Sequence, residues 1–141
     1  MEKERIIVSA CLLGKNCKYD GGNNYNQKVI DYLQDKDYTI ICPELLAGFS
    51  IPRLKIEMKN GDLVNIDGQI LNEEMEISKA KLQKIIDEYH PTLAILKSKS
   101  PSCGKDYIYD GTFSKTLIDG NGFACELILK NGIKVITEND F

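Results

Sequence analysis

Four short apolar runs recur along the chain, separated by longer amphipathic segments. The runs are rich in β-branched and aliphatic residues, each is bounded by polar or turn-forming residues, and they span 5–10, 38–41, 93–97 and 133–137. Runs of this length without alternation are typical of strands buried within a parallel sheet. The pattern therefore predicts four strands, of which those over 5–10 and 93–97 should be buried.

The segments between these runs have helical periodicity. Apolar residues at helical spacing predict a helix over 27–34 and another over 120–129. A longer helix is predicted to begin with Asn72 as its N-cap, because acidic residues follow it and favour a helix N-terminus. This helix should end at His90, because the residue before Pro91 disfavours α-helical backbone.

Strand and helix alternate from one end of the sequence to the other. This order favours parallel strands joined by right-handed crossovers, and hence an α/β fold. We expect three α/β/α layers around a mainly parallel, four-stranded, Rossmann-like sheet. Two tight-turn dipeptides within 45–71 predict a small hairpin or irregular excursion. No repeat or linker interrupts the chain, so residues 1–141 are expected to form a single domain.

Composition restricts the possible partners. Hydrophobic residues make up 43% and charged residues 28% of the 141 residues, and the net charge is −3. This balance argues against general nucleic-acid binding and against a membrane-surface role. No apolar run approaches the ~20 residues that span a bilayer, and the N-terminus lacks a secretory pattern. A cytoplasmic protein is expected.

Three of the five cysteines follow predicted strands along the chain: Cys11, Cys42 and Cys103. Ligands of α/β folds bind beyond the carboxyl ends of the strands, so these thiols should converge on one site. The chain has no C-x-x-C pair and only one histidine, His90, which weakens a zinc-ribbon interpretation. His90 itself is interpreted as structural.

Thiolates are soft ligands that select zinc, copper(I) or an iron–sulfur cluster, so all three remain candidates for binding at a site of three convergent thiols. Glu44 follows Cys42 closely and is a candidate general acid or base. Ser100 and Ser102 are candidates for stabilising a developing anion or orienting a water. The cations near these motifs are candidates for offsetting thiolate charge or binding an anionic group of a substrate: Arg53, Lys97, Lys99 and Lys105.

The two remaining cysteines have other interpretations. Cys125 lies between apolar residues of a predicted helix and is interpreted as a small buried side chain. Cys17 lies in a predicted loop, and three roles stay open for it: a spare thiol, a resolving thiol or a metal ligand.

Taken together, the motifs resemble those of a bacterial family, formerly a domain of unknown function, whose characterised members are thiouracil desulfidases. The matching segments run in the same order over nearly the whole chain, and Ser100-Pro101-Ser102-Cys103-Gly104 is the most specific of them. The others span 8–14, 18–21, 42–44, 52–53, 94–99 and 108–113.

The resemblance implies a [4Fe–4S] cluster held by Cys11, Cys42 and Cys103, with one iron free of protein ligands; aerobic preparation can remove such a cluster. It implies non-redox desulfuration of a thiolated pyrimidine, base or nucleotide, with Glu44 activating water and a serine of 100–102 assisting proton movement. Arg53 and Lys97 are then expected to bind substrate. Lys18 and Lys99 replace arginines common in the family, which bears on substrate choice.

Two other functions compete with this one. The same cysteines could serve a non-catalytic carrier of metal or persulfide sulfur, which should tolerate Glu44→Gln. They could also serve a cluster-free enzyme that uses a cysteine of low pKa, which should stay active after chelation.

Overall fold

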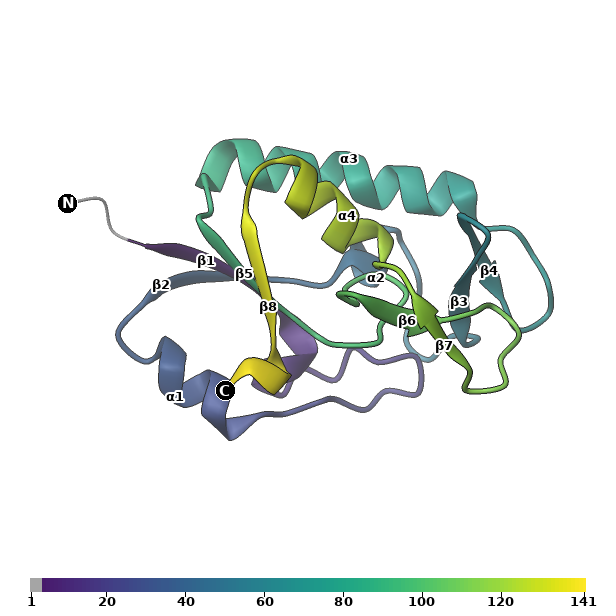
Figure 1. The fold of residues 1–141 in the computed structure, drawn as a ribbon, viewed down its shortest axis with the longest axis horizontal. Helices are drawn as coiled ribbons and strands as arrows, with labels where there is room; N and C mark the ends of the chain where they lie inside the picture. The colour runs from purple at the N-terminus through teal and green to yellow at the C-terminus, as the bar shows by residue number, and fades with distance from the viewer. Residues whose placement is uncertain (1–3) are drawn as a thin grey trace.

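A four-stranded parallel sheet forms the centre of the computed structural model, which describes residues 4–141. Its strands are β1 (Arg5–Ser9), β2 (Asp37–Ile41), β5 (Leu93–Leu96) and β8 (Lys134–Thr137), in the order β2-β1-β5-β8. All three neighbouring pairs are parallel (Figure 1). The predicted α/β class and all four predicted strands are confirmed.

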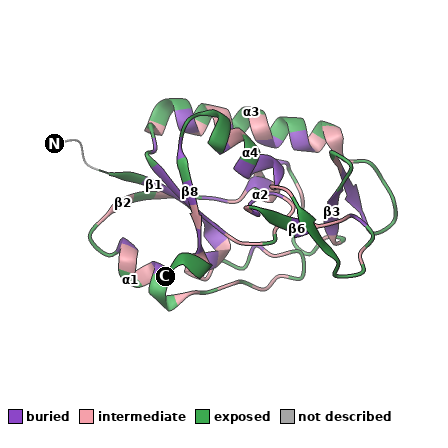
Figure 2. Ribbon diagram, in the orientation of Figure 1, coloured by how far each residue is buried: buried purple, intermediate pink, exposed green. Residues whose placement is uncertain are grey.

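Helices cover both faces of this sheet. The short 3-10 helix η1 (Ala10–Leu13) and helix α1 (Gln27–Leu33) pack on one face, while α3 (Asn72–Tyr89) and α4 (Phe123–Lys130) cover the other (Figure 1). Successive residues of a strand point to opposite faces, so β1 gives Ile6 and Val8 to the α1 side and Ile7 to the α3 side. The two central strands, β1 and β5, are buried over nearly their whole length, whereas the edge strand β2 is partly exposed (Figure 2).

Two helix starts differ from the prediction. Asn72 does not cap α3: its side chain accepts a hydrogen bond from the Leu63 amide and donates one to Asp62, so it fastens the helix start to a neighbouring hairpin. The third predicted helix begins at Phe123 instead of residue 120, because Leu117–Asp119 forms a strand.

Two hairpins extend from the layered core. The predicted excursion within 45–71 is the antiparallel pair β3 (Ile56–Lys59) and β4 (Asp62–Asn65), whose turn places Asn60 and Gly61 at positive φ. The second pair, β6 (Tyr107–Tyr109) and β7 (Leu117–Asp119), was not predicted. Two short helices complete the chain, α2 (Pro43–Leu46) and the 3-10 helix η2 (Glu138–Asp140).

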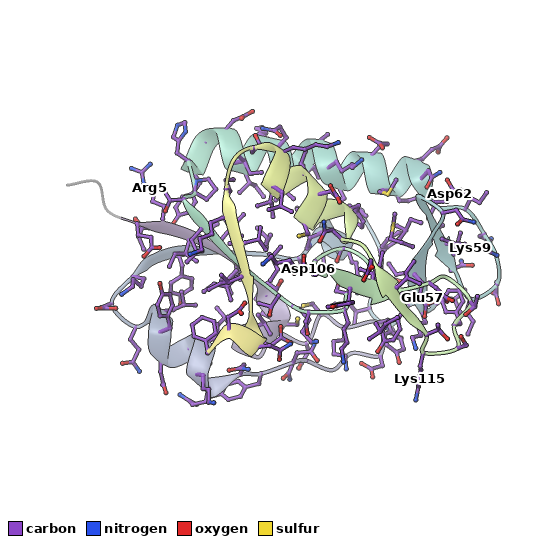
Figure 3. All side chains as sticks on the ribbon, viewed as in Figure 1. Arg5, Glu57, Lys59, Asp62, Asp106 and Lys115 are labelled. Atoms are coloured by element: carbon purple, nitrogen blue, oxygen red, sulfur yellow. The ribbon has the colours of Figure 1, made fainter. Side chains whose placement is uncertain are left out.

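Glu57 joins these hairpins. Its side chain lies where β3 meets the β6–β7 loop (Figure 3) and is 1% exposed. One carboxylate oxygen, Oε1, accepts the backbone amides of Gly111 and Phe113 at 3.0 and 3.1 Å, whereas Oε2 is buried without a partner. The Glu57 carboxylate thus fastens the β6–β7 loop to β3.

We predict that Glu57→Ala lowers the free energy of unfolding by about 2–4 kcal/mol, because two backbone amides lose their acceptor. Glu57→Gln keeps an acceptor oxygen and should stay within about 1 kcal/mol of the native protein. Urea-induced unfolding measures both. Equal losses in the two variants would contradict this role of the carboxylate oxygen.

No helix within residues 4–141 combines the length and the apolar character needed to cross a bilayer.

Candidate functional site

The carboxyl ends of β1, β2 and β5 meet at one cavity. Cys11 lies in η1 directly after β1, Cys42 lies between β2 and α2, and Cys103 lies in the turn that follows β5. All three line a cavity of about 300 Å³, within the range of about 300–1,000 Å³ typical of small-molecule sites. The structure therefore brings together the three thiols that were expected to converge.

The turn that carries Cys103 is organised by Ser100. The Ser100 hydroxyl accepts the amides of Ser102 and Cys103 at 3.1 and 3.0 Å. The turn packs so closely on the start of α4 that a Cβ on Gly122 would lie 2.4 Å from the Ser102 carbonyl. Only glycine fits there, and the contact fixes Cys103 at the cavity.

Glu44 lies at the centre of a hydrogen-bonded network. Arg53 Nη2 donates to its Oε1 at 2.9 Å, and Ser102 Oγ donates to its Oε2 at 3.1 Å. The two side chains of the ion pair are only 7% (Arg53) and 17% (Glu44) exposed. Ser100 Oγ lies 3.0 Å from Ser102 Oγ, so the carboxylate connects to both serines. A continuous hydrogen-bonded chain therefore runs from Glu44 through Ser102 to Ser100.

Arg53 also ties together separate parts of the site. Its Nη2 donates to the Cys17 carbonyl at 2.9 Å and its backbone amide donates to Tyr19. Its Nε is buried and has no protein partner among the described residues. A buried donor without an acceptor is costly, and the hydrogen bonds of the other guanidinium nitrogens offset that cost.

Lys97 lines the cavity but already has a carboxylate partner. Its Nζ lies 3.1 Å from Glu138 Oε2 and donates to the Ser98 carbonyl at 2.9 Å. Burial favours a raised pKa for the Glu138 carboxyl, but the Ser98 hydrogen bonds and the Lys97 charge bring it below the usual range. Lys97 is thus held by Glu138 of η2, a segment that the sequence pattern did not predict as part of the site. Lys99 also lines the cavity, whereas Lys105 lies outside it.

The cavity thiols differ in their electrostatic surroundings. The hydrogen bond with Cys17, the Asn24 amide and the Lys97 charge lower the pKa of Cys11 to about 7 against the effect of burial. Contact with Cys17 also lowers the pKa of Cys42, while the contacts with Cys11 and Cys42 raise that of Cys17. Burial raises the pKa of Cys103 to about 12, so a bound cation would be needed to keep this thiol ionised near neutral pH.

Other residues of the site were not among the predicted site residues. Asn24 Nδ2 donates to the Cys11 sulfur at 3.3 Å, and Ser9, which lines the cavity, accepts the Lys97 amide at 3.0 Å. Lys55, directly before β3, and Tyr109, at the end of β6, line the same cavity, with Lys55 Nζ 5.9 Å from the Tyr109 ring centroid. These two residues reach the cavity because the two hairpins lie beside it, a tertiary arrangement that the sequence pattern does not specify.

A family model described as 2-thiouracil desulfurase matches residues 6–140. The chain belongs to this family. It is 36% identical over 145 residues to the uncharacterized protein YbbK of Bacillus subtilis (strain 168), an alignment that covers 96% of each chain. It is also similar to the solved structure of a [4Fe–4S]-dependent thiouracil desulfidase, TudS: the TM-score is 0.91 at 32% identity, over 99% of this chain and 93% of that one. The expected family resemblance is confirmed.

Proposed function

We propose that this protein is a [4Fe–4S]-dependent desulfidase that removes sulfur from a thiolated pyrimidine without net redox change. The observation that carries the proposal is the meeting of three thiols with the Glu44–Ser102 network in one cavity. Membership of the 2-thiouracil desulfurase family and the likeness to the TudS structure support the choice of substrate and cofactor.

The donor set fits an iron–sulfur cluster. Within residues 4–141 no group of three or more histidine, cysteine, aspartate or glutamate side chains is arranged around a single metal ion. In a cluster each thiolate binds its own iron, so Cys11, Cys42 and Cys103 need only line the same cavity. The Cys11 sulfur also accepts a hydrogen bond from the Asn24 side chain at 3.3 Å, as cluster ligands commonly do.

When bound, a cluster with one iron free of protein ligands supplies a Lewis acid for the thiocarbonyl sulfur and makes that sulfur a better leaving group. The rest of the reaction falls to the protein. Glu44 takes a proton from the attacking water, and the ion pair with Arg53 orients its carboxylate. Ser102 and Ser100 relay protons to and from Glu44 Oε2.

Substrate binding uses the cations of the cavity. Arg53 lines the cavity, and its guanidinium is a candidate to bind the remaining carbonyl of the pyrimidine. Lys97, fixed by Glu138, places positive charge beside Cys11, where thiolate charge accumulates. Lys55 and Tyr109 form the cavity wall on the side of the hairpins.

Anaerobic turnover tests this function. Protein reconstituted with iron and sulfide should convert thiouracil to uracil, with loss of thiocarbonyl absorbance and release of one hydrosulfide for each thiouracil consumed, without added reductant. Chelator-treated protein should be inactive. Full activity after chelation would favour a cluster-free thiol enzyme, and iron binding without turnover of thiouracil or its nucleotide would favour a carrier.

A further inference from the structure

Glu138, the first residue of η2, reaches the segment that follows β5. Its side chain is only 11% exposed, although it does not line the cavity. Its Oε1 accepts the Ser98 amide at 2.8 Å, and its Oε2 accepts the Ser98 hydroxyl at 2.8 Å and lies 3.1 Å from Lys97 Nζ. Both carboxylate oxygens thus bind the two residues that continue β5 toward the Cys103 turn.

The sheet and a capping box set the position of Glu138. The parallel pairing of β5 with β8 ends at Leu96 and Thr137, one residue before Glu138. Asp140 Oδ2 accepts the Thr137 amide at 2.8 Å, and Thr137 Oγ1 accepts the Asn139 amide at 3.2 Å. Glu138 lies inside this closed turn, so its carboxylate continues the contact between the two chain segments where the strand pairing stops.

Lys97 is held from several sides. Its amide donates to the buried Ser9 hydroxyl at 3.0 Å, and its Nζ donates to the Ser98 carbonyl at 2.9 Å and to the Ser98 hydroxyl at 3.3 Å. With Glu138, these acceptors match the three N–H donors of an ammonium group. Lys97 lines the cavity with Cys11 and Cys103, and it therefore acts there through its fixed positive charge.

We propose that Glu138 is a positioning residue for the desulfuration, which holds the Lys97 ammonium where its charge stabilises the negative charge that develops on the thiocarbonyl sulfur. This inference rests on the proposed function. As water attacks the thiocarbonyl carbon, an electron pair of the carbon–sulfur double bond moves onto sulfur. A lysine side chain is flexible, and a cation fixed in advance stabilises this charge without reorganisation during the reaction.

A double-mutant cycle tests whether Glu138 acts through Lys97. Glutamine at 138 keeps an oxygen for the Ser98 amide, but its NH₂ group cannot accept from Lys97. With thiouracil and anaerobically reconstituted protein, Glu138→Gln should lower kcat/KM by about 2- to 10-fold, the range for ordering one long side chain. Lys97→Met should lower it more, and the double variant no further than Lys97→Met alone. Additive losses, or a native kcat/KM in Glu138→Gln, would overturn the proposal.

Amine labelling tests the contact independently of turnover. Lys97 of the reconstituted protein is labelled with a trace of acetic anhydride, and peptide mass spectrometry compares its rate with that of Lys130, an exposed lysine of α4 outside the cavity. Glu138→Gln should raise the labelling rate of Lys97 several-fold and leave that of Lys130 unchanged. Equal labelling of Lys97 in the native protein and in Glu138→Gln would overturn the proposal.

Glu126→Gln is the matched control, because Glu126 also accepts a side-chain hydrogen bond, from Asn121, but is exposed in α4 outside the cavity. It should leave kcat/KM, iron content and Lys97 labelling unchanged. If Glu138→Gln does not fold, Glu138→Asp replaces it, since the shorter side chain withdraws the carboxylate from Lys97. A lower kcat/KM with faster Lys97 labelling in Glu138→Asp then supports the proposal, and native values of both overturn it.

The outcomes also separate this inference from the proposed function. Native protein that holds a cluster but does not turn over thiouracil would contradict the proposed function and, with it, the role of Glu138. Native protein that desulfurates thiouracil, with the same kcat/KM and the same Lys97 labelling in Glu138→Gln, would contradict the role of Glu138 alone.

Discussion

Cys42→Ala is expected to abolish retention of the iron–sulfur cluster. Cys42 is the residue between β2 and α2, and its sulfur lines the cavity with those of Cys11 and Cys103. Two remaining thiols cannot hold a cluster that needs three, and alanine offers no replacement ligand. Iron and sulfide analysis after anaerobic reconstitution should show loss of nearly the whole cluster, together with loss of its visible absorbance.

Cys125→Ala is the matched control for this prediction. Cys125 is fully buried in α4 among apolar residues and does not line the cavity. This variant should retain the native iron content. Native iron content in Cys42→Ala as well would show that the ligand assignment is wrong.

Glu44→Gln should keep the cluster and lower the turnover number by about 10²–10⁴, the range for loss of a general acid or base. The glutamine amide can still accept from Arg53, but it cannot take a proton from water. In the native protein Ser102 Oγ donates to Glu44 Oε2. In the variant the glutamine NH₂ group takes the place of this oxygen, so the serine relay loses its acceptor.

The control for this substitution is Glu88→Gln, at an exposed position of α3 outside the cavity, which should leave turnover unchanged. Thermal unfolding of both variants separates catalysis from stability, because Glu44→Gln also leaves the buried Arg53 charge without its partner. Native turnover in a folded, cluster-loaded Glu44→Gln protein would contradict the hydrolytic role and fit a sulfur or metal carrier.

Much of this fold could be predicted because its strands are short apolar runs with clear boundaries. Parallel strands place their carboxyl ends at one edge, so the positions of Cys11 and Cys42 after β1 and β2 were enough to predict that these thiols meet. Cys103 lies farther from its strand, and its approach depends on the Ser100 turn and on close packing against Gly122.

The rest of the site depends on contacts between distant segments. The Arg53–Glu44 ion pair was not predicted, although both residues were candidates, because nothing in their spacing specifies that they touch. The hairpin β6–β7 was missed because its strands are three residues each and largely exposed, so they show no buried pattern. Asn72 fits the composition of an N-cap, but a tertiary hydrogen bond from Leu63 takes its side chain.

Mössbauer spectroscopy of protein reconstituted with iron-57, before and after addition of thiouracil under anaerobic conditions, tests the central claim most directly. Three protein thiols and a cluster of the kind named for the TudS structure leave one iron without a protein ligand. One iron subsite should therefore differ from the other three and should alone change when thiouracil is added. Four equivalent iron sites that do not respond to thiouracil would contradict the account.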